Sequence, residues 1–137
     1  MRQALAVAQQ ALPLDVPVGA LVLSPTGQVL AEAHNQREAL NSPTAHAEIL
    51  ALEAAAKTLG SWRLTGCTLV VTLEPCPMCA SAIAQSRLAA VVYGAADPLY
   101  GACGSRYNLL HYPVSVACLG GILADDCQAL LRSSFKR

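Results

Sequence analysis

A histidine and two cysteines in this chain have the residue types and the spacing of a metal-binding site. His46 lies two positions before Glu48, and Cys76 lies three positions before Cys79. One imidazole and two thiolates suit Zn²⁺, and three protein ligands leave its fourth coordination position open for a water molecule. A zinc ion lowers the pKa of that water toward 7 and makes hydroxide available at neutral pH. The pattern therefore predicts a hydrolytic site with one zinc ion bound by His46, Cys76 and Cys79.

Glu48 is not needed as a ligand in this arrangement, so it is free to carry protons between the bound water and a substrate nitrogen. Residues two positions apart point in different directions in the middle of a helix. His46 and Glu48 can therefore face one site only from the first turn of a helix. Pro77 favours a second helix that begins at that residue, with Cys76 as its N-cap. Two helix N-termini then face the metal, and their dipoles favour the thiolate forms of the cysteines.

A structural role is the alternative for these residues. Cys76 and Cys79 could belong to a structural metal site or be two buried thiols, with His46 as a helix cap. A closed structural site would need a fourth histidine or cysteine ligand. The remaining cysteines lack ligand spacing and are interpreted as small thiols of the core; they are Cys67, Cys103, Cys118 and Cys127.

The elements that must hold these residues alternate between helical and extended patterns. Strands are predicted where short apolar or β-branched runs occur, and helices where apolar residues recur every three or four positions. Pro13 ends the first helix and Gly60 ends the second. The predicted helices cover residues 5–12, 45–59, 77–87 and 123–134, and the predicted strands cover residues 16–23, 29–34, 68–73, 89–93 and 114–117. Residues 97–111 are predicted to form a loop with a short helical piece.

This order of elements predicts an α/β fold, namely a three-layer α/β/α sandwich around a mixed five-stranded sheet. Residues 16–23 and 29–34 form a hairpin across a turn that contains Pro25 and Gly27. A helix connects strand 68–73 to strand 89–93, so these two strands are expected to be parallel with a right-handed crossover. No internal repeat or linker interrupts the sequence, and we expect residues 1–137 to form a single domain.

The composition excludes several classes of protein. Of the 137 residues, 54% are hydrophobic and 13% are charged, which excludes a disordered chain. Nine basic residues balance nine acidic ones, so no overall basic field marks a nucleic-acid binder, although a local basic patch is compatible with this balance. No apolar run reaches the roughly 18 residues that a membrane helix needs, and the N-terminal apolar run is too short for a signal peptide. We therefore expect no membrane partner and a cytoplasmic location with reduced cysteines.

The sequence around the candidate ligands resembles the zinc-dependent deaminases, whose H-x-E and P-C-x-x-C motifs match residues 46–48 and 75–79. Further segments resemble the bacterial branch of these enzymes that is specific for tRNA adenosine. They are residues 16–20, 34–35, 43–49, 72–80, 93–95, 101–102, 104–105 and 121–124. The resemblance covers nearly the whole chain, from Arg2 to Phe135, and implies a cytidine-deaminase-like fold.

The resemblance implies hydrolytic deamination of adenosine to inosine at the wobble position of a tRNA anticodon loop, in an arginine tRNA. It also implies a homodimer with RNA contacts from both subunits, and it gives the zinc ligands and Glu48 the roles described above. Asn35 would hydrogen-bond the purine or its sugar, the Ala47 amide would meet the oxygen at C6, and Asp97 would lie near the flanking nucleotides. Considered without the resemblance, Asn35 is more readily interpreted as a turn residue after the hairpin.

The chain departs from these relatives at positions that an RNA-binding surface would use. Leu99 stands where they usually have Lys or Arg, and the tail after Arg132 lacks a second aromatic residue and a longer basic end. Arg132, Lys136 and Arg137 either contact phosphate or only complement the dipole of the last helix.

Two other functions follow from the same residues. The first is zinc-dependent deamination of a free nucleobase or nucleoside, of the guanine or cytosine type, which the zero net charge and Leu99 favour. The second is a non-enzymatic, zinc-containing RNA-binding subunit, against which the intact Glu48 argues.

Overall fold

A computed structural model describes residues 1–135 of the chain. Five strands and four α-helices alternate along it, and one short 3₁₀ segment extends the first helix. In chain order they are α1 (Arg2–Ala8), η1 (Gln9–Ala11), β1 (Gly19–Leu23), β2 (Val29–His34), α2 (Ala47–Leu59), β3 (Thr68–Leu73), α3 (Pro77–Gln85), β4 (Ala90–Ala95), β5 (Ala117–Leu119) and α4 (Ala124–Ser134).

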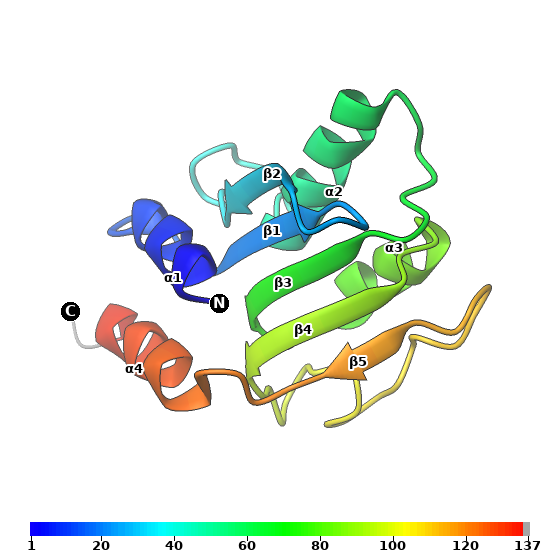
Figure 1. Ribbon diagram of the computed structural model, residues 1–137. Helices are drawn as coiled ribbons and strands as arrows, with labels where there is room; N and C mark the ends of the chain where they lie inside the picture. The colour runs from blue at the N-terminus through cyan, green and yellow to red at the C-terminus, as the bar shows by residue number, and fades with distance from the viewer. Residues whose placement is uncertain (136–137) are drawn as a thin grey trace.

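The strands form one mixed sheet in the order β2-β1-β3-β4-β5, which confirms the predicted five-stranded sheet (Figure 1). β1 pairs antiparallel with both β2 and β3, whereas β3–β4 and β4–β5 are parallel pairs. The parallel arrangement of β3 and β4 was expected, because α3 connects the two strands.

Helices cover both faces of the sheet, as Figure 1 shows. α2 packs on β1 and β2 and contacts α3, while α1 packs on β1, β2 and β3 and α4 packs on β4. The larger apolar core lies beneath α2 and α3 and includes Leu52, Leu69 and Ile83. A smaller core beneath α1 contains Val7 and Val70. Because strand residues alternate between the faces, both cores draw on the same strands.

α4 lies close against β4 because Gly94 has no side chain. A Cβ atom at this position would collide with Cys127 Sγ, and it would also lie 2.8 Å from the Thr72 carbonyl oxygen. The close contact holds α4 where Gln128 and Leu131 line the candidate site described below.

Several predicted boundaries differ from the observed ones. The last strand is Ala117–Leu119 rather than residues 114–117, and the first helix begins at Arg2 and ends in a 3₁₀ turn. Residues 16–18 precede β1 instead of belonging to it, and the loop after residue 97 contains no helical piece. β5 is exposed along all three residues, so no alternation of apolar and polar residues marked it. Among the described residues, no helix has the length and apolar character needed to cross a membrane.

Candidate zinc centre

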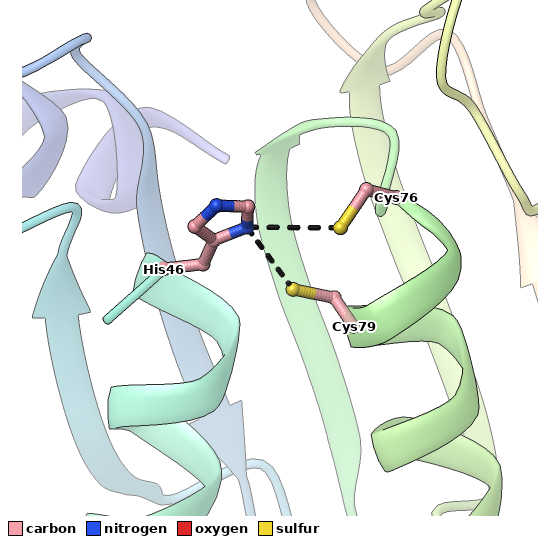
Figure 2. A group of neighbouring side chains, drawn as sticks. All are labelled: His46, Cys76 and Cys79. Carbon is pink, nitrogen blue, oxygen red and sulfur yellow. Dashed lines mark hydrogen bonds between the residues drawn. The ribbon is translucent and has the colours of Figure 1, made fainter. Parts of the chain in front are cut away.

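The three candidate ligands lie at the N-terminal ends of two helices that start at the same edge of the sheet (Figure 2). His46 is the N-cap residue of α2 and has extended backbone angles, φ −70° and ψ 152°. Cys76 is the N-cap of α3, with Pro77 at the first helical position. Proline suits this position because its missing N–H would have no partner there. The geometry predicted for both helix starts is therefore confirmed.

The distances between the ligand atoms fit a tetrahedral zinc site. His46 Nδ1 lies 3.7 Å from Cys76 Sγ and 3.5 Å from Cys79 Sγ, as Figure 2 shows. A tetrahedral zinc ion with ordinary Zn–N and Zn–S bond lengths separates nitrogen from sulfur by about 3.6 Å. Among the described residues, these three form the one group of potential ligands close enough to share an ion.

Electrostatic effects prepare the two sulfur atoms differently when no metal is bound. A hydrogen bond from Cys79 and a second interaction with His46 outweigh burial and lower the pKa of Cys76 to about 4. The hydrogen bond to Cys76, together with burial, raises the pKa of Cys79 above its usual range. The separate hydrogen bond between His46 and Cys76 raises the pKa of His46. Cys76 is therefore a thiolate at neutral pH, which is the form that binds zinc.

Glu48 occupies the second position of α2 and is only 5% exposed. Burial raises the pKa of its carboxyl group from the ordinary value of 4.5 to about 6. A carboxyl group that titrates near neutral pH is suited to accept and return a proton within one reaction cycle.

A cavity of about 1010 Å³ opens beside these residues. His46, Glu48 and Cys76 line it, and so do residues from the loops that follow η1, β2 and β4. The predicted substrate residues Asn35, Ala47 and Asp97 also line this cavity. Every predicted site residue except the buried Cys79 therefore lines the same cavity.

The side chains of Asn35 and Asp97 already form hydrogen bonds with backbone groups of the protein. Asn35 Nδ2 donates to the Val16 carbonyl oxygen at 3.1 Å, and Asn35 Oδ1 accepts from the Arg37 amide at 3.1 Å. The turn-forming role considered for Asn35 is therefore present in the structure. Asp97 Oδ1 accepts from the amides of Leu99 and Tyr100 at 3.0 and 3.1 Å, and so stabilises the turn that begins there.

Two buried carboxylates beside the cavity were not predicted from the sequence. Asp15 accepts hydrogen bonds from the amides of Glu38 and Ala39, at 2.6 and 3.1 Å. Glu74 lies immediately after β3 and is also buried. An acidic residue directly after a strand of apolar and β-branched residues is a signal that could have identified Glu74, because acidic residues are almost never fully buried without partners.

The basic residues at the end of the chain lie mostly outside the part that the structure describes. Arg132 is in the last turn of α4 and is exposed, whereas Lys136 and Arg137 fall outside the described residues. Leu99, which stands where a basic residue was expected, is 63% exposed at the cavity.

Comparison with known proteins agrees with this geometry. Residues 1–95 match the family model described as the cytidine and deoxycytidylate deaminase zinc-binding region. The tRNA-specific adenosine deaminase of Bacillus subtilis is 46% identical over 125 residues, which are 89% of this chain and 77% of that protein. A solved structure from studies of A-to-I editing by tRNA:A34 deaminases superimposes with a TM-score of 0.90 at 37% identity, covering 95% of this chain and 96% of that one.

A longer relative also matches. The tRNA(Ile)-lysidine synthase of Deinococcus deserti is 47% identical over 139 residues, which are 99% of this chain but only 26% of that protein. The chain thus spans about a quarter of this relative and most of the length of the deaminase from Bacillus subtilis.

Proposed function

Because this chain belongs to the cytidine and deoxycytidylate deaminase family, we propose that it hydrolyses adenosine to inosine at the wobble position of a tRNA anticodon loop. The observation that carries the proposal is the buried Glu48 on the same cavity wall as His46 and Cys76, which form the candidate zinc site together with the buried Cys79. The fold-wide similarity to tRNA adenosine deaminases supports the choice of substrate. Zinc binding also agrees with the donor set, in which a thiolate and an imidazole lie at the correct separation.

In this proposal His46, Cys76 and Cys79 would hold one zinc ion per chain, and the bound metal would supply an activated water for hydrolysis at C6 of adenine. The carboxylate of Glu48 would take one proton from that water and give it to the ring nitrogen beside C6, and would then carry the second proton from the oxygen added at C6 to the amino group, which leaves as ammonia. Its burial excludes bulk water as a competing base, and its raised pKa allows both transfers near neutral pH.

Asn35 and Ala47 orient the base in the proposed complex. Each polar atom of the Asn35 side chain retains one more hydrogen-bonding position, which can face the purine or its sugar. The Ala47 amide belongs to the first turn of α2, where amides have no acceptor within the helix, and it is proposed to donate to the oxygen that forms at C6.

The nucleotides on either side of the base are proposed to meet a mostly apolar rim. Asp97 fixes the turn that presents Leu99 and Tyr100, which are 63% and 65% exposed. Any base can stack on an aromatic side chain such as that of Tyr100, and Leu99 offers an apolar contact beside it. Arg37 is the one arginine or lysine on the described lining of the cavity. We therefore expect a shallow salt dependence of RNA binding, from roughly two to four phosphate contacts.

The proposal includes an arginine tRNA as substrate, a homodimer as the active form and the cytoplasm as the place of action. The tRNA and the dimer follow from the resemblance to bacterial tRNA-specific adenosine deaminases, and the location follows from the sequence interpretation given above. Light scattering at micromolar concentration is expected to give twice the chain mass of 14.3 kDa. A monomer that deaminates RNA would contradict the dimer.

The test is deamination of a panel of substrates by the zinc-loaded protein, measured as ammonia release for every substrate and as inosine formation for those that contain adenosine. An anticodon stem-loop with a wobble adenosine is compared with the same stem-loop carrying guanosine there, and with free adenosine, guanine and cytosine. We expect turnover of the adenosine stem-loop and little of free adenosine, because a free nucleoside lacks the flanking contacts that position the base. Faster turnover of free guanine or cytosine than of any stem-loop would replace this proposal with the free-base alternative.

A further inference from the structure

Glu74 is a buried carboxylate that the proposed chemistry does not use. It follows β3 directly, lies two positions before the ligand Cys76 and is 2% exposed. Its oxygen atoms accept four hydrogen bonds, and every donor belongs to one loop, residues 97–105. The donors are the amides of Asp97 at 3.0 Å, Cys103 at 3.1 Å and Ser105 at 3.0 Å, and the hydroxyl group of Ser105.

This loop forms one wall of the cavity. Four consecutive residues, 97 to 100, line the cavity, and no helix or strand of the sheet holds them. A buried carboxylate is costly unless it is hydrogen-bonded, and here the loop supplies all the donors. The burial of Glu74 and the conformation of the loop therefore depend on each other.

Two further contacts fit the loop closely to this carboxylate. The Ala102 amide donates to the Pro75 carbonyl oxygen at 2.8 Å. A Cβ atom at Gly101 would collide with the Glu74 carboxyl group and with the Asp97 carbonyl oxygen. The segment Glu74–Cys76 therefore contacts the loop through Glu74 and Pro75 and supplies a zinc ligand through Cys76.

We infer that Glu74 is a positioning residue that sets the shape of the substrate wall formed by residues 97–105. It acts on the binding of the nucleotides that flank the reacting base, and not on zinc or on proton transfer. This inference rests on the proposed function, since the flanking nucleotides are those of an RNA substrate.

The first experiment compares the zinc-loaded wild type with Glu74→Gln, which keeps the size of the side chain but replaces one acceptor oxygen with a donor. We expect one zinc per chain, at least tenfold faster amide exchange at Cys103 and Ser105, and a KM for the stem-loop that rises about 10- to 100-fold while kcat changes less than about threefold. Unchanged exchange, or a fall in kcat without a rise in KM, would overturn the inference. Loss of zinc would do so as well, because Glu74 would then support the metal ligand.

Gly101→Ala tests the same contact from the loop, without changing an ionisable group or a residue next to a ligand. It is expected to raise KM and speed amide exchange as Glu74→Gln does. Ser105→Ala removes one of the four hydrogen bonds and should have a smaller effect in the same direction. The matched control is Ser61→Ala, since Ser61 makes a comparable hydrogen bond with Arg63 away from the cavity; its KM and exchange rates should equal those of the wild type.

Failure of the inference is separable from failure of the proposed function. If the wild type does not deaminate the stem-loop, the proposed function fails in the wild type itself. The amide exchange of Glu74→Gln then still shows whether the carboxylate holds the loop. If the amides of Cys103 and Ser105 exchange as slowly in Glu74→Gln and in Gly101→Ala as in the wild type, the inference is overturned whichever substrate the protein deaminates.

Discussion

Replacing Glu48 with glutamine removes a proton acceptor while preserving the size of a buried side chain. Three other carboxylates that line the cavity, Asp15, Glu74 and Asp97, already accept hydrogen bonds from backbone amides. The fourth, Glu38, is exposed to solvent and lacks the burial of Glu48. Positioned proton transfer typically contributes about a hundred- to ten-thousand-fold in rate. We therefore expect kcat for the stem-loop to fall by that factor, which corresponds to about 2.7–5.4 kcal/mol in activation free energy.

The pH dependence gives a second, independent measure. Burial raises the pKa of Glu48 to about 6 in the metal-free protein, and the positive charge of a bound zinc ion lowers it again. The acid limb of kcat/KM in the wild type should therefore have its midpoint between about pH 4.5 and 6, and the residual activity of Glu48→Gln should lack that limb.

The assay is single-turnover inosine formation across pH 4.5–8, with zinc content measured at each pH to exclude metal loss. One zinc per chain in Glu48→Gln is required for this interpretation. If the variant loses its zinc, Glu48 is a ligand and the division of roles is wrong. If it keeps zinc and more than about a tenth of the wild-type rate, Glu48 is not the proton carrier.

Three further outcomes test other parts of the structure. Cys79→Ala should lower zinc content well below one per chain and lower the unfolding temperature, whereas Cys127→Ala, equally buried but outside the cluster, should retain full zinc by metal analysis. Gly94→Ala should destabilise the protein by about 1–3 kcal/mol in urea unfolding, because its Cβ meets Cys127, and Cys127→Ala in the same chain should recover part of that loss. With zinc chelated, Glu48→Gln should be more stable than the wild type by up to about 2 kcal/mol at pH 7. The wild type loses stability as pH rises from 4.5 through the raised pKa of Glu48, so this advantage should disappear below pH 4.5 in paired urea titrations; an equal difference at both pH values would contradict it.

The sequence was sufficient for the parts of this fold that depend on local chemistry. Pro77 and the spacing from His46 to Glu48 place both helix starts, and β-branched residues identify β3 to the residue. The position of β5 could not be predicted, because a three-residue exposed edge strand owes its existence to pairing with β4.

The roles of the buried carboxylates were also beyond the sequence. The donors to Asp15 lie 23 and 24 residues away, and those to Glu74 lie 23 to 31 residues away. All but one are backbone amides, which every residue except proline possesses, so no residue type marks the partner. Only the folded sheet brings these loops to the carboxylates.

The separation of the ligands along the chain has a consequence for how zinc and folding are coupled. Cys76 and Cys79 are three positions apart and remain close neighbours when the chain is unfolded, whereas His46 is 30 residues from Cys76 and joins them only after β1 has paired with β3. The cysteine pair therefore gives the unfolded chain some affinity for zinc. A ligand that also binds the unfolded state stabilises the folded state less than its full affinity would suggest. The unfolding temperature should accordingly rise less steeply with zinc concentration than it would for a site that has no affinity for zinc in the unfolded chain.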